Sequence, residues 1–289
     1  MTASRRLAPV MMAGLVSLAL VTMTLHAQLR DASPRVITLS PHLAELVYAA
    51  GAGETLVATV EYSDFPDAAR QLPRVGDAFR LDRERILSLE PDLLLAWDGG
   101  TPAAVIEQLR GDGYEVVVTG GPTLASVADA LEQIGRLTGY EEAAAGRAKA
   151  YRRELSALTD RYAGRDVLRT FFQISERPLY TVTGAQIISQ AIELCGGENV
   201  FADLPGLAAQ VSAEAVVAAD PQVILATADG DSDPLARWHR FEHLKAVSDG
   251  HLYLINRDLV SRPGPRILAG VEQICECLQG SRRGGEDGS

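Results

Sequence analysis

Residues 82–96, DRERILSLEPDLLLA, decide the fold because residues 212–226, SAEAVVAADPQVILA, repeat their pattern in the second half of the chain. Each copy opens with a helix-capping residue and continues as a short amphipathic helix whose second residue is a glutamate, Glu84 or Glu214. An acidic residue and a proline then mark a turn before a fully apolar strand. The repeat predicts that one helix–strand unit occupies corresponding places in two lobes, with a cleft between them and two matched carboxylates.

Length and composition agree with two lobes of ordinary size. The chain has 289 residues, 47% hydrophobic, and a formal net charge of -11. Two cores can form at this length. The acidic balance, with no basic stripe along the sequence, argues against a nucleic-acid partner. We expect an acidic monomer.

The N-terminus has the order of a secretory signal. Arg5 and Arg6 precede an uncharged apolar run over residues 7–25, and small Ala27 follows. This pattern predicts a signal peptide over residues 1–27 that is cleaved after Ala27 during export. The alternative is an uncleaved membrane anchor, because an apolar run of this length could span a bilayer.

The remaining sequence alternates strand and helix patterns. Residues 34–137 form a first α/β lobe and residues 167–279 a second, each with a mainly parallel sheet of Rossmann-like type. Residues 141–165, rich in Ala, Arg and Glu, predict one long helix that joins the lobes as a stiff rod. The alternative is one more surface helix of the first lobe. Residues 280–289 lack apolar side chains, so we expect a disordered tail.

Three cysteines, Cys195, Cys275 and Cys277, enter an oxidising compartment if the chain is exported. Cys275 and Cys277 point to different faces of the last predicted helix, so only one of them can pair with Cys195. Three cysteines without nearby histidines give no recognisable zinc-ligand spacing.

Six short motifs, in order along residues 35–278, resemble one known family. They are VITLSP at 36–41, EYSDFP at 61–66, ERI at 84–86 with PD at 91–92 and AW at 96–97, LCGGEN at 194–199, QVSAE at 210–214 and PRI at 265–267. The family is that of cobalamin-binding periplasmic receptors of ABC importers, within the iron-chelate and cobalamin class of solute-binding proteins.

The resemblance implies two α/β lobes bridged by a long rigid helix, little hinge closure, and a cobalamin or related corrinoid bound in the cleft. It implies a periplasmic location and delivery of the ligand to a permease dimer with its ATPase subunits. Haem or a ferric siderophore is the alternative ligand within the class. The positions that match ligand contacts are Tyr62, Trp97, Asp258, Leu259, Val260, Ser261 and Arg262.

Two further roles follow from the resemblance. Glu84 and Glu214 match the carboxylates that dock on the permease, and Cys195 and Cys275 match the family's disulfide, which leaves Cys277 as an odd thiol. The internal repeat selects the same two glutamates independently. For a single glutamate at this helix position, a favourable interaction with the helix dipole would be sufficient explanation.

The chain also departs from the family. Two positions at which a cobalamin receptor of the family carries tryptophans facing the corrin correspond here to about Ala78 and Ala208, although Phe79 lies beside the first. The aromatic side chain expected near Ile174 is absent. We therefore expect a cleft with fewer aromatic walls.

The residues themselves suit a flat amphipathic ligand. Tyr62 and Trp97 can cover an apolar face, while Arg262 and Asp258 can hydrogen-bond polar groups at its rim. The alternatives are core packing for Trp97 and an ordinary loop ion pair for Arg262 and Asp258. His42 could approach a metal centre as an axial ligand, but a single histidine is more often a hydrogen-bonding group at a helix end.

No catalytic motif stands out in the sequence. There is no G-x-S-x-G, no phosphate-binding glycine loop after a strand and no metal-binding histidine pair. We therefore expect a binding protein without a resident cofactor or metal rather than an enzyme, with a periplasmic enzyme on the same scaffold as the remaining alternative.

Overall fold

The first lobe is built on a four-stranded parallel sheet. The computed structural model describes residues 33–77, 80–227 and 233–286. The strand order is β2-β1-β3-β4, formed by β1 (Val36–Thr38), β2 (Leu56–Ala58), β3 (Leu93–Trp97) and β4 (Val116–Thr119). All three strand pairs are parallel. The helices are α2 (Pro41–Ala49), η1 (Gly53–Thr55), α3 (Asp67–Arg70), α4 (Arg83–Ser88), α5 (Ala103–Gly111) and α6 (Ser126–Thr138).

Alternate strand residues divide the first core into two layers. Val36, Leu93 and Leu95 pack with the buried side chains of α2 and α6. Leu94 and Ala96 point to the other face and pack with α4 and α5. This alternation is that of a strand whose two faces are both covered by helices.

The second lobe has a mixed sheet of order β10-β9-β5-β6-β8, with β7 also paired to β5. Its strands are β5 (Leu168–Glu176), β6 (Leu179–Val182), β7 (Gly197–Asn199), β8 (Ala208–Gln210), β9 (Val223–Thr227) and β10 (Leu252–Ile255). Its helices are α8 (Ile187–Leu194), α9 (Ala213–Ala219), η2 (Trp238–Arg240), α10 (Lys245–Ser248), α11 (Arg257–Val260) and α12 (Ile267–Glu286).

The pairings β5–β9, β9–β10 and β5–β7 are parallel, whereas β5–β6 and β6–β8 are antiparallel. The sequence did not predict the antiparallel part. The chain reverses within the two residues between β5 and β6, Arg177 and Pro178, and so short a connection can only return the chain as an antiparallel neighbour.

The internal repeat is present in three dimensions. Asp82 accepts a hydrogen bond from the backbone N–H of Arg85, at 3.0 Å, and Ser212 accepts one from Ala215, at 3.2 Å. A left-handed acidic residue follows each helix, Glu90 with φ of 46° and Asp220 with φ of 42°, and the chain then enters a central strand, β3 or β9. The left-handed turn residue before each strand is therefore common to both lobes.

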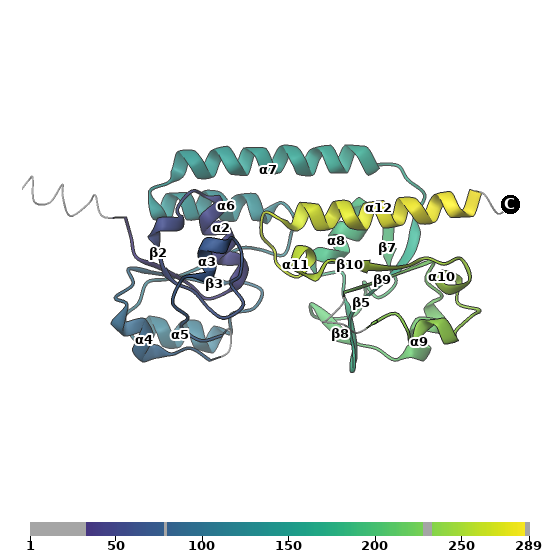
Figure 1. The fold of residues 1–289 in the computed structure, drawn as a ribbon, viewed down its shortest axis with the longest axis horizontal. Helices are drawn as coiled ribbons and strands as arrows, with labels where there is room; N and C mark the ends of the chain where they lie inside the picture. The colour runs from purple at the N-terminus through teal and green to yellow at the C-terminus, as the bar shows by residue number, and fades with distance from the viewer. Residues whose placement is uncertain (1–32, 78–79, 228–232, 287–289) are drawn as a thin grey trace, which may run out of the picture.

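A helix of 22 residues, α7 (Glu141–Tyr162), joins the lobes. It runs alongside α6 in the first lobe and reaches α12 in the second (Figure 1). Its inward side chains, including Tyr151 and Leu158, belong to one continuous apolar core that extends from the first sheet to α8 and α12. The predicted connecting helix is confirmed, and it shares its core with both lobes.

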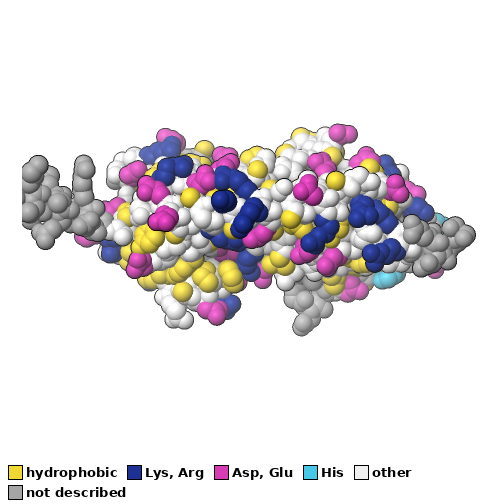
Figure 2. Space-filling model, turned by 90° about the horizontal axis from the view of Figure 1, so that it is seen from above, with side chains coloured by type: hydrophobic (Ala, Val, Ile, Leu, Met, Phe, Trp, Pro, Cys, Tyr) yellow, Lys and Arg dark blue, Asp and Glu magenta, His cyan; other side chains and the backbone are white. Residues whose placement is uncertain are grey.

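The face formed by α7 and α12 carries Lys and Arg interspersed with Asp and Glu (Figure 2). One of its ion pairs, Arg161 Nη1 to Glu272 Oε1 at 2.9 Å, joins α7 to α12. Among the described residues, no helix combines the length and the apolar character that a membrane crossing requires. The predicted signal peptide, residues 1–27, lies outside the described part of the chain.

The prediction of a disordered tail is wrong for residues 280–286, because α12 continues through Glu286. Ser281 is buried, and Arg282 donates to the carbonyl oxygens of Asp166, Cys195 and Gly196 at 2.9 to 3.0 Å. These polar contacts hold the last residues of α12 in place, although residues 281–286 include no apolar side chain. Residues 287–289 lie outside the described chain.

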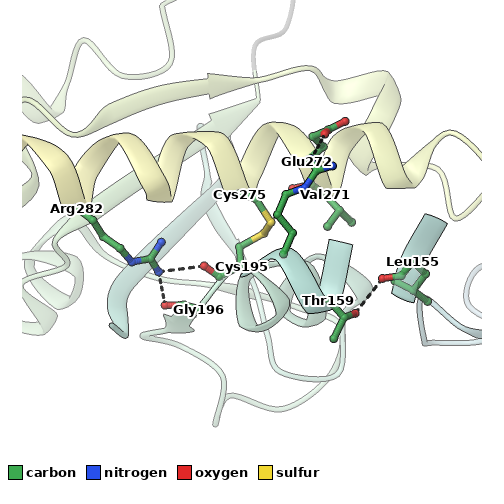
Figure 3. The surroundings of a disulfide bond; sticks show 9 residues. Leu155, Thr159, Cys195, Gly196, Val271, Glu272, Cys275 and Arg282 are labelled. Carbon is green, nitrogen blue, oxygen red and sulfur yellow. Dashed lines mark hydrogen bonds and ion pairs between the residues drawn. A yellow bond between two sulfur atoms is a disulfide. The ribbon is translucent and has the colours of Figure 1, made fainter. Parts of the chain in front are cut away.

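The disulfide joins Cys195 and Cys275, as the resemblance implies, and links the end of α8 to α12 (Figure 3). Both cysteines are fully buried. Arg282 contacts the carbonyl of Cys195 from the next turns of α12 (Figure 3). Cys277 is free, and burial raises the pKa of its thiol to about 11, so it is a thiol and not a thiolate at neutral pH.

Replacing Cys195 and Cys275 together by serine should lower the free energy of unfolding by about 2 to 5 kcal/mol, because the bond closes a long loop. Guanidinium denaturation under nonreducing conditions measures this change. Cys277→Ser is the matched control and should change stability far less. A double variant as stable as the control would contradict a structural role for the bond.

Candidate ligand-binding cleft

Two adjoining cavities lie between the lobes and share Trp97 and Ser261. The larger, of about 680 Å³, is lined by Tyr62, Asp64, Asp258 and Arg262 among others. The smaller, of about 370 Å³, has a mainly apolar wall that includes Ile174, Leu207, Ala208 and Pro263. Charged side chains thus gather in the larger cavity, the smaller one is mainly apolar, and one tryptophan borders both.

Tyr62 projects into the larger cavity from the loop after β2. Its side chain is 78% exposed, and its backbone has φ of 65°, in the left-handed region that a tyrosine rarely adopts. An exposed aromatic side chain held by a strained backbone is a feature of ligand-binding positions. This geometry supports the ligand-contact role over a core role.

Trp97 ends β3, at the carboxyl edge of the parallel sheet, where ligands bind in open α/β folds. Its backbone N–H donates to Thr101 Oγ1 at 3.0 Å, and its ring meets the edge of His42 at a centroid distance of 4.8 Å. A Cβ added at Gly100 would overlap the ring, so the glycine lets the loop fold over it. Trp97 is thus fixed in position yet borders both cavities.

Arg262 lies at the centre of an ion cluster between the lobes. Its Nη1 atom is 3.3 Å from Glu45 Oε1 and also pairs with Asp64, and its Nη2 atom is 3.5 Å from Asp258 Oδ1. The hydrogen bond from Arg262 lowers the pKa of Asp64 below its ordinary value. Arg262 and Asp258 come from the second lobe, whereas Glu45 and Asp64 come from the first.

The sequence alone does not single out Glu45, yet the structure places it within this ion cluster. The side chain of Glu45 is only 2% exposed. Arg266 donates two hydrogen bonds to this carboxylate, from Nε to Oε2 at 2.8 Å and from Nη2 to Oε1 at 2.7 Å. Arg266 also lies over the ring of Phe65, at 3.9 Å from its centroid. A buried carboxylate needs such partners, and here they come from the other lobe.

A second polar contact joins the lobes beside the smaller cavity. Gln190 of α8 accepts from the N–H of Leu124 and donates to the carbonyl of Pro122, both at 3.1 Å. The walls of the cleft are thus tied together at separate points.

Residues 258–262 divide between cavity and core. Asp258, Ser261 and Arg262 line the larger cavity. The expected ligand contact of Val260 is wrong in this structure: α11 turns this side chain into the core, where it lies against Gly270. Leu259 lines neither cavity, and a ligand contact for it stays a prediction.

Two of the positions at which the chain is expected to lack the family's aromatic side chains lie at the cleft. Ile174 and Ala208 both line the smaller, apolar cavity. Ala78 and Phe79 lie outside the described residues.

His42 is buried beside the larger cavity. Its Nδ1 atom is 2.9 Å from Ser40 Oγ, whereas its Nε2 atom has almost no exposure to solvent and finds no hydrogen-bond partner within the described chain. Burial, and secondarily the charge of Arg262, lowers its pKa to about 3. The geometry favours a neutral ring supporting Trp97 over an axial metal ligand. Among the residues described, no three His, Cys, Asp or Glu side chains gather as a metal site.

The buried ring of His42 should make stability depend on pH. In the unfolded chain the imidazole binds a proton below about pH 6.5, whereas in the folded protein it stays neutral down to about pH 3. The unfolded state therefore gains protons as pH falls through this window, and the free energy of unfolding should fall by up to about 2 kcal/mol between pH 7 and 5.

His42→Gln should remove this part of the pH dependence, as measured by chemical denaturation at both pH values. His239→Gln, at an exposed position, is the control and should keep the slope of the unaltered protein. Equal slopes in all three proteins would show that His42 is not held neutral.

Glu84 and Glu214 are exposed on α4 and α9. These two helices lie at corresponding ends of the two lobes, on the side away from α7 (Figure 1). The hydrogen bonds of Glu214 with its own backbone N–H and with Ser212 lower the pKa of its carboxyl, so it is ionised at neutral pH. The two exposed glutamates thus lie on helices at the same side of the molecule.

The chain belongs to the periplasmic binding protein family, whose model matches residues 36–259. A vitamin B12-binding protein of Vibrio parahaemolyticus is 36% identical over 250 residues, covering 86% of this chain and 90% of the relative. The crystal structure of the periplasmic vitamin B12-binding protein BtuF of Vibrio cholerae is similar with a TM-score of 0.81 and 36% identity, covering 86% of this chain and 98% of that one.

More distant structures share the fold alone. The periplasmic heme-binding protein RhuT of Roseiflexus sp. RS-1 is 22% identical with a TM-score of 0.76, covering 86% of this chain and 99% of that one. The expected family, and the fold of two α/β lobes, are therefore confirmed. The family and the relatives named above are binding proteins rather than enzymes.

Proposed function

We propose that this chain is a periplasmic receptor that captures cobalamin, or a related corrinoid, in the cleft and delivers it to an ABC permease. The observation that carries the proposal is similarity to vitamin B12-binding proteins over most of both chains, together with a cleft of suitable chemistry. We further propose that residues 1–27 direct export and are removed, which the mass of the exported protein tests.

The cleft suits the ligand's chemistry. A corrinoid is a broad, flat disc with amides around its rim, so it needs apolar and aromatic cover for its faces and a few polar groups for its edge. Tyr62 and Trp97 supply aromatic surface, and the smaller cavity supplies apolar wall. Asp258, Ser261 and Arg262 supply the polar groups at the rim.

Capture requires no large closure of the lobes. The ion cluster, the Gln190 contact and the shared core hold the walls in place before the ligand arrives. A preformed site loses less conformational entropy on binding, which favours affinity. Because Arg262 is already paired with three carboxylates, a ligand must share its hydrogen bonds without displacing Glu45.

A ligand panel tests the proposal most directly. We expect cyanocobalamin to bind at one molecule per chain in isothermal titration and its absorption spectrum to survive desalting. Haemin and a ferric siderophore should bind far more weakly. Tyr62→Ala should weaken cobalamin binding by about 1 kcal/mol, within the range for an aromatic contact, while Tyr62→Phe retains most of it.

Haemin retained at stoichiometric level in place of cobalamin would move the chain to the haem branch of the class. Absence of binding to every member of the panel, or turnover of a ligand, would contradict the proposal as a whole.

Glu84 and Glu214 are the proposed docking carboxylates for basic side chains of a permease dimer. Replacing both by alanine should abolish detectable complex formation with the reconstituted importer and leave cobalamin affinity unchanged, because charge pairs set orientation and encounter rate. The control, Glu142→Ala with Glu276→Ala, makes the same charge change on the α7 and α12 face. Complex formation by both double variants alike would contradict the docking role.

A further inference from the structure

Each of the two helices α4 and α9, here called the docking helices, exposes an apolar residue at the same place in the repeat. Leu87 is 67% exposed and Val217 is 36% exposed. The preceding residues, Ile86 and Val216, are both fully buried. The repeat therefore matches in its outward apolar residue as well as in its inward one.

A single exposed leucine or valine is normal on a protein surface. A matched pair at equivalent positions of two lobes calls for an explanation, because the flanking residues are not shared. Arg83 and Arg85 flank Glu84, whereas alanines flank Glu214. The glutamate and the apolar residue are shared while their neighbours are not. This combination indicates that both residues serve a common contact.

In each docking helix, the glutamate and the exposed apolar residue lie close together. Leu87 follows Glu84 by three residues, and Val217 follows Glu214 by three, so each pair lies on one face of its helix. Beside the first pair is a hollow of about 510 Å³, lined by Arg83, Glu84, Leu87, Asp112 and Tyr114. This hollow can receive a side chain of a partner next to Leu87.

We infer that Leu87 and Val217 form, with Glu84 and Glu214, two composite contacts for the permease dimer. The inference rests on the proposed function and names the chemistry of the partner: each of two identical subunits presents a basic side chain beside an apolar one. Both docking helices lie on the side away from α7, so a symmetric partner can reach both at once (Figure 1). Leu87, the more exposed residue, contributes more than Val217.

The test compares complex formation between cobalamin-loaded variants and the full importer, permease with ATPase subunits, in nanodiscs. Leu87→Ser with Val217→Ser should weaken the complex about tenfold or more, because truncating two interface residues removes two contributions that multiply in affinity. Cobalamin affinity should stay unchanged. Val167→Ser with Leu254→Ser is the matched control, because these residues are exposed apolar side chains elsewhere in the second lobe.

Salt separates the two kinds of contact. Salt screens charge pairs between exposed groups but not apolar contacts. Because moderate salt screens the charge pairs only in part, the unaltered protein should still bind at a salt concentration at which Leu87→Ser with Val217→Ser no longer shows detectable binding. Leu87→Ser alone should cost more than Val217→Ser alone.

Binding of the apolar double variant equal to that of its control would overturn this inference. If Glu84→Ala with Glu214→Ala then still abolishes the complex, the docking role of the glutamates stands without an apolar component. If the glutamate variant also binds normally, or the unaltered protein does not bind the importer, the proposed docking itself fails.

Discussion

The cleft depends on one buried carboxylate. Glu45 of the first lobe has almost no contact with water, and Arg262 and Arg266 of the second lobe neutralise it. Separating the lobes would leave this charge unpaired in a poorly solvated site, and breaking a buried pair in this way is strongly destabilising. The interaction therefore restrains the lobes, whatever its net contribution to the stability of the folded chain.

The shared apolar core acts in the same direction. Side chains of α7 pack in one cluster with those of both sheets, so a hinge motion would have to open that cluster. Recognition on this scaffold is consequently a matter of fitting a preformed shape. A flat, rigid ligand suits such a site, because neither partner must reorganise to make the contact. The exposed ends of the lobes, where α4 and α9 lie, therefore keep a constant separation, so that one partner can contact both.

The sequence predicted the features that come from a repeated motif or from alternating strand and helix patterns. The two lobes, the long helix and the matched glutamates followed from local patterns, and the family resemblance placed Trp97, Tyr62 and the disulfide. Contacts between distant residues were not predictable: Glu45 gives no sign in the sequence that Arg266 will reach it from the other lobe. Val260 was misassigned because the single turn of α11 directs its side chain into the core while Asp258 faces the cavity. The tail was misassigned because Arg282 fixes it through backbone carbonyls, which composition does not show.

The distance between the lobes in solution tests the central claim. Spin labels at Ala104 and Ala218, exposed positions in different lobes, can be introduced as cysteines in a Cys277→Ser background and measured by pulsed electron resonance. A restrained cleft predicts one narrow distance distribution that shifts by less than about 2 Å when cyanocobalamin binds. A broad distribution without ligand, or a shift of many ångströms on binding, would contradict a preformed cleft held by Glu45.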